Sequence, residues 1–350
     1  MKVKQIIAGI ILAGLFLSLN ACGLREKEKP KLKVIYAGSL IQPLEEASKQ
    51  FNKLYPEVEV ETEGHGSIQV IRYVTDLGKK ADVLLVADYS LISSLMYDDY
   101  ANWYIKFATN QLVIAYTEKS KYAAKINSAN WYEILSLPEV KFGLAHPLLD
   151  ACGYRSLMAI QLAELYYQKP NIFKYLIANN FDPSVKVQKD DGNYTIFIPE
   201  VIKPLSQKVS LRGGSIQVLA LLDAGLIDYA FEYRSVALQH GLKFVELPPQ
   251  INLSSPVCDD FYRQVKVNFG FQRFSAIGNE QAGKVIFYGL TIPKNARDPL
   301  WAEEYVKFIL GPEGKKIFTE HEHPVIPPEA DNLYQIPPAL APFIKKEKTW

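Results

Sequence analysis

The chain has 350 residues, a length at which two domains are the usual expectation. Its 39 lysine and arginine residues and 38 aspartate and glutamate residues leave a formal net charge of +1. This balance argues against a nucleic-acid-binding protein, because such proteins normally carry a basic excess. Hydrophobic residues make up 48% of the chain, which excludes extensive disorder, and three cysteines are too few for a disulfide scaffold.

The N-terminal segment has the pattern of an export signal. Two lysines precede an apolar stretch, residues 6–19, that is shorter than the roughly 20 residues needed to span a bilayer. The sequence LNAC at residues 19–22 resembles a bacterial lipobox and predicts that Cys22 is acylated. An ordinary cleaved signal with an incidental cysteine is the alternative. Residues 23–30 are rich in charge and are predicted to be a solvated tether, so we expect a lipid-anchored, extracytoplasmic protein.

The next part of the chain alternates between strands and helices. Short apolar strands are predicted at residues 32–36, 58–61 and 81–86, and helices at 40–54 and 68–77. A glycine and a serine stand just before or at the start of each helix. Alternation of this kind is typical of βα units with a parallel sheet.

The remainder continues with mixed signals for strands and helices. Strands are predicted at residues 112–116, 140–144, 227–233 and 285–292, and helices at 131–135, 156–167, 216–222, 301–310 and 314–318. A turn is expected at residues 147–155, a hairpin insertion at 181–203 and a proline-rich wrapping tail from 324 onward.

Common catalytic motifs are missing from the sequence. It contains no G-x-S-x-G elbow, no P-loop and no H-E-x-x-H helix. His321 and His323 have a spacing that can ligate a metal, although such a pair near a tail is usually at the surface. A disulfide between Cys152 and Cys258 stays open, because an extracytoplasmic protein is in an oxidising environment.

Small polar residues stand at the starts of several helices. Ser39, Ser67 and the turn at residues 150–153 each precede a predicted helix. The first amides of a helix lack intrahelical partners and carry partial positive charge, so several helix starts around one cleft can bind an anion. Helix capping alone explains each of these residues taken singly.

Seven segments together resemble the tungstate/molybdate-binding proteins of ABC importers, in particular the archaeal-type lipoproteins of that family. The segments are YAGSL (36–40), HGS (65–67), GKKADVL (78–84), YANWY (100–104), DACGYRSL (150–157), IDYAFEYRSVA (227–237) and YGLTIP (288–293). The resemblance extends over about residues 32–345. Its most specific parts are the two runs that contain Tyr-Arg-Ser.

The resemblance implies an α/β fold of the two-lobed type II periplasmic-binding-protein class, with a ligand cleft between the lobes. Lobe one is then residues 31–112 plus 285–350, and lobe two is residues 113–284. The protein would bind tungstate or molybdate, perform no chemistry and need no cofactor. It would act as a monomer that delivers the oxyanion to the permease and ATPase of an ABC importer.

The resemblance also implies a set of ligand-binding residues. The hydroxyl groups of Ser39, Ser67 and Tyr233 would donate hydrogen bonds to the oxyanion. The backbone amides of Ala151 and Cys152 would donate from lobe two. A hydrogen bond to a charged group contributes about 1.5–3 kcal/mol, so a handful of them can support micromolar to nanomolar affinity after the cost of association.

Carboxylates in this site need a separate account. The resemblance implies that Asp150 adds an oxygen ligand to tungstate, which sulfate cannot accept; helix capping is the alternative. The archaeal pattern places a second carboxylate eighteen residues before the tyrosine that matches Tyr233, and that position is Ser215 here. A tetrahedral oxyanion that accepts a hydrogen bond from Ser215 is therefore plausible. Strand alternation directs Glu232 to the face opposite Tyr233, which favours a structural or surface role.

Two other functions stay open at this point. The same fold can bind sulfate, phosphate or an organic anion, and Arg155 and Arg234 fit structural ion pairs as well as a ligand. An exported hydrolase that uses Asp150 and Glu232 as an acid/base pair is the alternative from another class. Such a pair needs carboxyl groups about 5–10 Å apart.

Overall fold

A computed structural model describes residues 29–270 and 280–345, and the described residues from Lys31 onward form one compact unit. The expected signal segment and Cys22 lie outside the described residues, so acylation stays a prediction. Within the described residues, no helix is long and apolar enough to cross a membrane.

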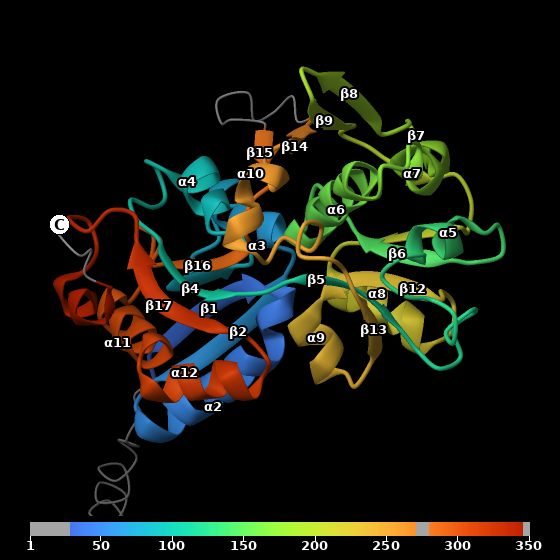
Figure 1. Ribbon diagram of the computed structural model, residues 1–350. Coiled ribbons are helices and arrows are strands. Elements are labelled where there is room, and N and C mark those ends of the chain that lie inside the picture. The colour runs from blue at the N-terminus through green and yellow to red at the C-terminus, as the bar shows by residue number, and fades with distance from the viewer. Residues whose placement is uncertain (1–28, 271–279, 346–350) are drawn as a thin grey trace, which may run out of the picture. The chain divides into compact units, whose positions relative to one another are not determined.

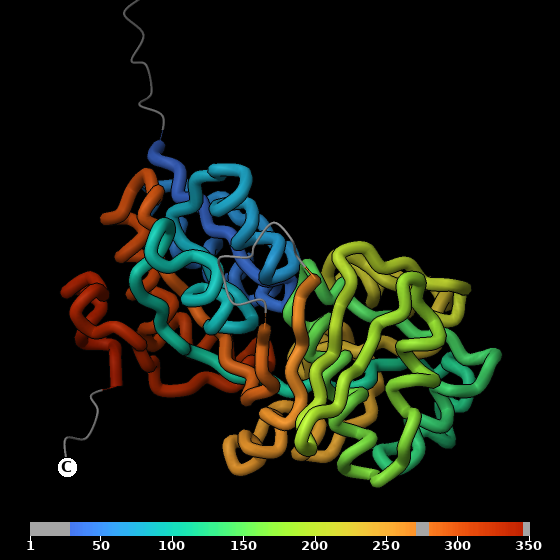
Figure 2. Tube along the Cα trace, turned by 90° about the horizontal axis from the view of Figure 1, so that it is seen from above, coloured from blue at the N-terminus to red at the C-terminus, as the bar shows by residue number. Residues whose placement is uncertain are grey.

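The first sheet has six strands in the order β17-β4-β16-β3-β1-β2 (Figure 1). Its strands are β1 (Lys31–Ala37), β2 (Glu59–His65), β3 (Val83–Val86), β4 (Ile105–Thr109), β16 (Phe287–Thr291) and β17 (Val325–Ala330). β1 pairs in parallel with β2 and β3, as the βα pattern predicts. β16 runs antiparallel to β3 and β4, so the sheet joins early and late parts of the chain, as the blue and red segments of Figure 2 show.

Helices with one apolar face cover this sheet. They are α2 (Ile41–Leu54), α3 (Ser67–Thr75), α4 (Ser90–Met96), α11 (Pro299–Leu310) and α12 (Pro312–Glu320), with the 3-10 turns η1 (Gly38–Leu40) and η5 (Pro338–Phe343). α2 buries Leu44, Ala47 and Phe51, which recur at helical spacing, while α3 packs on β1 and β3. In each βα unit, the carboxyl end of the strand leads into the next helix. The starts of these helices therefore lie along the same end of the parallel strands.

The second sheet has five strands in the order β11-β6-β12-β5-β13. Its strands are β5 (Leu112–Tyr116), β6 (Phe142–Ala145), β11 (Val209–Arg212), β12 (Tyr229–Tyr233) and β13 (Lys243–Glu246). Around it lie α5 (Trp131–Ser136), α6 (Ala151–Tyr167), α7 (Ile172–Leu176), α8 (Ser215–Asp223), α9 (Arg234–Gln239) and η2 (Ala178–Asn180). β6 is parallel to β11 and β12, whereas β5 is antiparallel to β12 and β13.

Two crossings connect the sheets. The chain leaves the first sheet at the end of β4, Thr109, and enters the second at the start of β5, Leu112. It returns through β16. The side-chain amide of Asn110 donates to Ser235 Oγ at 2.8 Å and to the Tyr288 hydroxyl at 3.1 Å, so the first crossing is tied to a helix beside the second sheet and to β16 in the first.

A smaller four-stranded sheet packs beside α6 in the order β15-β14-β9-β8. It consists of β8 (Lys186–Asp190), β9 (Asn193–Ile198), β14 (Val265–Phe269) and β15 (Glu280–Ala282). β8 and β9 pair in antiparallel register, which confirms the predicted hairpin. The remaining elements are the pair β7 (Phe181–Asp182) and β10 (Lys203–Pro204), with η3 (Pro256–Cys258) and α10 (Asp259–Tyr262).

The start of α6 differs from the sequence prediction. A turn was expected at residues 147–155, but the helix begins at Ala151. A glycine such as Gly153 is typical of a turn, yet in the structure it lies within the helix and allows close packing. A Cβ there would lie 2.4 Å from the Ala145 carbonyl oxygen at the end of β6. The glycine therefore brings α6 onto the sheet and does not end a turn.

Several other expectations need correction. Strands β4, β11, β13 and β14 were not predicted, and the proline-rich tail contains β17, which pairs with β4 at the sheet edge, where proline is tolerated. His323 is fully buried and lies within 3.3 Å of Ser235 Oγ, so the surface expectation for it is wrong. The described residues contain no cluster of three or more potential metal ligands. Cys152 and Cys258 are both free thiols.

Candidate anion-binding site

The structure brings all seven predicted site residues to the junction between the two sheets. Each lies at the end of a strand or the start of a helix, and each is at most 4% exposed. They are Ser39 in η1, Ser67 at the start of α3, Asp150, Ala151 and Cys152 at the start of α6, Ser215 at the start of α8, and Tyr233 at the end of β12. Residues that are distant in sequence thus form one buried polar region.

Direct backbone contacts join the starts of α3 and α6. The carbonyl oxygen of Leu149 accepts hydrogen bonds from Ile68 N at 3.0 Å and Gln69 N at 3.1 Å. Gly66 makes this approach possible, because a Cβ there would lie 2.3 Å from the same oxygen. The start of α3, on the first sheet, therefore touches the residue that leads into α6, on the second.

Asp150 connects the starts of α6 and α8. Its Oδ1 accepts from Cys152 N at 2.8 Å, and its Oδ2 accepts from Ser215 N at 3.3 Å. The first contact is an N-cap, in agreement with the capping alternative. It also means that the Cys152 amide already has a protein acceptor. Burial raises the pKa of Asp150 to about 6, against the lowering effect of these two amides.

Three hydroxyl groups in the site each accept one hydrogen bond from the protein. Ser67 Oγ accepts from Ala87 N at 3.1 Å, and Ser39 Oγ accepts from the Tyr288 hydroxyl at 2.9 Å. The Tyr233 oxygen accepts from Arg155 Nη1 at 2.8 Å. Among the described residues these are the only hydrogen bonds of the three groups, so the hydrogen of each hydroxyl is left to donate.

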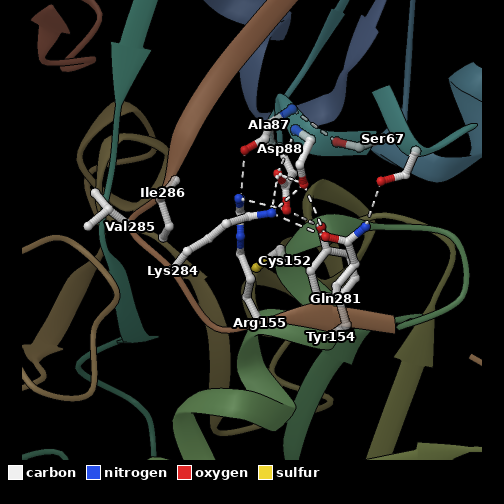
Figure 3. Close-up of polar contacts among 12 residues, drawn as sticks. Ser67, Ala87, Asp88, Cys152, Tyr154, Arg155, Gln281, Lys284, Val285 and Ile286 are labelled. Atoms are coloured by element: carbon white, nitrogen blue, oxygen red, sulfur yellow. Dashed lines mark hydrogen bonds and ion pairs between the residues drawn. The ribbon is translucent and has the colours of Figure 1, made fainter. Parts of the chain in front are cut away.

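Arg155, Asp88 and Lys284 form a buried ion-pair network (Figure 3), which supports Tyr233 through Arg155. Arg155 in α6 donates through Nη1 to the Ala87 carbonyl oxygen at 2.6 Å, and its Nη2 lies 3.2 Å from Asp88 Oδ2. Asp88 also accepts from the Tyr154 hydroxyl at 2.6 Å and lies 3.6 Å from Lys284 Nζ. Burial acts to raise the pKa of Asp88, but the positive charges of Lys284 and Arg155 outweigh this effect and lower it. Arg155 therefore has the structural ion-pair role.

Glu232 lies beside the predicted site residues Tyr233 and Ser215, although strand alternation favoured a structural or surface role for it. It is fully buried in β12, and its Oε1 accepts from Tyr233 N at 2.7 Å. Burial raises its pKa to about 8; the Tyr233 amide and Ser215 oppose this effect, and Asp150 adds to it. The surface half of the expectation is thus wrong, while the hydrogen bond to Tyr233 N agrees with the structural half. The available signal was a glutamate in a strand whose other residues are apolar or aromatic, because burying a charge there is costly.

Two sheets joined by crossing strands, with helix starts and hydroxyl groups at their junction, define a periplasmic-type binding protein. Solved structures agree with this class. The fold is similar to that of the periplasmic molybdate-binding protein of Azotobacter vinelandii, with a TM-score of 0.55 and 14% identity over 83% of this chain and 98% of that one. It is also similar to that of the sulfate-binding protein SubI of Mycobacterium tuberculosis H37Rv, with a TM-score of 0.56 and 14% identity over 89% of each chain. The fold is that of the type II periplasmic binding proteins.

Sequence comparison then places the chain in one family. Residues 32–321 match the family described as bacterial extracellular solute-binding protein, and the chain belongs to this family. It is 45% identical to an uncharacterized solute-binding protein of Methanococcus aeolicus, over 91% of this chain and 88% of that protein. It is 41% identical to the molybdate/tungstate-binding protein WtpA of Pyrococcus abyssi, over 91% and 93%. The protein is therefore a solute-binding protein, and the hydrolase alternative is set aside.

Proposed function

We propose that this protein is the extracytoplasmic receptor that captures tungstate or molybdate for an ABC importer. Two findings support this ligand class: the chain belongs to a solute-binding family, and it is 41% identical in sequence to the molybdate/tungstate-binding protein of Pyrococcus abyssi. The partners would be the permease and ATPase of the importer. Acylation of Cys22 would hold the receptor at the membrane as a monomer.

One structural observation carries the proposal. Ser39, Ser67 and Tyr233 each accept a hydrogen bond from the protein and retain a hydrogen to donate. An oxyanion without bound protons only accepts hydrogen bonds, so it matches three such donors. Fixed donors in a buried site interact with a charge more strongly than they do in water. The Ala151 amide would complete the set. The Cys152 amide and the Ser215 hydroxyl would join it by exchanging their present partners, Asp150 and Glu232, for the anion.

The proposed division into two lobes suggests how the site binds and releases its ligand. Residues 31–112 plus 285–350 would form lobe one and residues 113–284 lobe two, with the oxyanion between them. Hinge closure around a ligand is a usual motion of such folds. The Leu149 contact with the start of α3 would belong to the closed arrangement. Asp150 would hold the starts of α6 and α8 together and face the ligand.

Calorimetric titration of the full-length protein with tungstate, molybdate, sulfate and phosphate tests the ligand class. We expect tungstate and molybdate to bind and sulfate to give no heat. If folded protein free of bound anion gives no heat with tungstate or molybdate, the proposed ligand is wrong. Binding of sulfate or phosphate alone would identify the receptor of another oxyanion.

Single serine variants test the assigned donors in the same titration. Ser39→Ala and Ser67→Ala should each lower tungstate affinity by roughly tenfold or more, because a hydrogen bond to a charged group contributes about 1.5–3 kcal/mol. Ser93→Ala is the matched control, since its hydroxyl donates to the Ser90 carbonyl oxygen within α4. Equal affinities for all three variants would contradict the site.

A further inference from the structure

The Glu232 carboxyl has two oxygens in different situations. Its Oε1 accepts a hydrogen bond from Tyr233 N at 2.7 Å. Its Oε2 is buried and has no hydrogen-bond partner among the described residues. A buried polar atom without a partner is costly, so this oxygen calls for a specific explanation.

The groups that face Glu232 come from three neighbouring elements and from its own strand. From α6 come Asp150, whose charge acts on the carboxyl, and Cys152, whose Sγ lies 4.0 Å from Oε1. Ser215 faces it from α8 and the Tyr288 phenol from β16, with Tyr233 beside it in β12. These groups are acidic or neutral. The guanidinium of Arg155 binds the Tyr233 hydroxyl, the Ala87 carbonyl and Asp88.

A neutral carboxyl suits these surroundings better than a carboxylate. An ionised Glu232 would be a buried negative charge that the Tyr233 amide and Ser215 only partly stabilise, close to the acidic Asp150. A protonated Oε2 is a hydrogen-bond donor that lies with the predicted ligand-binding residues Asp150, Ser215 and Tyr233. Burial favours the neutral form, in accordance with the raised pKa of about 8.

We propose that Glu232 binds the oxyanion as a neutral carboxylic acid, with the hydrogen on Oε2 donated to an anion oxygen. The inference rests on the proposed function, because it assigns one more donor to the same site. It has two consequences. An amide at this position can replace the acid as a donor, and the wild-type site loses this donor when Glu232 ionises in alkaline solution.

The matching experiment compares tungstate titrations of the full-length wild type, Glu232→Gln and Glu232→Ala at pH 7.0, 8.0, 9.0 and about 9.5. At pH 7.0, Glu232→Gln should bind within about threefold of wild type, and Glu232→Ala at least about tenfold more weakly. Above pH 8 the wild-type affinity should fall by up to about tenfold per pH unit, while the Glu232→Gln affinity changes little. Glu246→Gln is the matched control, since Glu246 is a β13 glutamate that is 61% exposed and pairs with Arg234.

Two results would overturn the inference. Wild-type affinity that rises with pH, together with loss of binding in folded Glu232→Gln, would show that the ionised carboxylate contacts the ligand. Equal affinity of Glu232→Ala and wild type would show that Glu232 does not contact it. Failure of the proposed function looks different, because the wild type itself would then bind no tungstate at any pH, and the inference would fall with it. Circular dichroism of each variant establishes that it is folded.

Discussion

Asp150 and Glu232 place two carboxyl groups in a region that otherwise consists of hydrogen-bond donors. Their surroundings differ. Asp150 accepts backbone hydrogen bonds through both oxygens, whereas Glu232 accepts one, through Oε1. Burial raises the pKa of Asp150 to about 6 and that of Glu232 to about 8. Hydrogen-bond donors oppose the rise at both residues, and the charge of Asp150 adds to it at Glu232. The two residues therefore titrate in different pH ranges.

In the ligand-free protein, the free energy of unfolding should depend on pH because Glu232 is protonated in the folded state. The folded pKa of about 8 lies above the unfolded value of about 4.3, so between these values the folded state binds more protons and stability falls as pH rises. The slope is at most about 1.4 kcal/mol per pH unit. Glu232→Gln should remove this slope. Urea unfolding from pH 6.5 to 8.0 should therefore show the unfolding free energy of the variant rising relative to that of wild type. Parallel curves would contradict this, and Glu246→Gln should parallel wild type.

At the scale of elements, the end of β3 and the helix α6 are joined by buried charges. Asp88 follows β3, Arg155 lies inside α6, and both are at most 1% exposed. Lys284 stands just before β16 and donates to Ser90 Oγ as well as pairing with Asp88. One carboxylate thus balances two cations between elements that pack on different sheets. The same network positions the Tyr233 hydroxyl.

Removal of the Asp88 charge should destabilise the whole fold. Asp88→Asn leaves Arg155 and Lys284 without a compensating charge, and breaking a buried pair costs about 3–5 kcal/mol. Urea unfolding at pH 7 measures the loss. Arg263→Gln is the control, because Arg263 is 65% exposed and pairs with Asp259 within one helical turn, so its removal should cost less than about 1 kcal/mol. Similar losses in both variants would argue against the network.

At the scale of the whole described unit, the two sheets meet through a close backbone approach. Gly66 and Leu149 make it, with the carbonyl of Leu149 on the first amides of α3. Gly38 adds an ordinary contact, since a Cβ there would lie 3.5 Å from the Ile216 side chain in α8. Helix starts with unpaired amides suit such a junction, because a carbonyl or an anion can satisfy them.

Gly66→Ala should hold the two halves apart without unfolding either one. Gly66 has φ −63° and ψ 146°, which alanine adopts freely, and the added Cβ would collide only across the junction, at 2.3 Å from the Leu149 oxygen. We expect a larger radius of gyration by solution X-ray scattering, with unfolding free energy within about 1 kcal/mol of wild type. Gly213→Ala is the control, because a Cβ there makes ordinary contacts. An unchanged radius of gyration would refute this account of the junction.

The sequence by itself determined the α/β class, the order of the βα units and the polar residues at helix starts. These features depend on local periodicity and on turn residues such as Ser39 and Ser67, which short segments encode. Strands β4, β11, β13, β14 and β17 were beyond it, because their pairing depends on partners distant in the chain. Only the tertiary structure decided that Glu232 is buried beside Ser215, since strand alternation says which face a side chain takes but not what packs against that face.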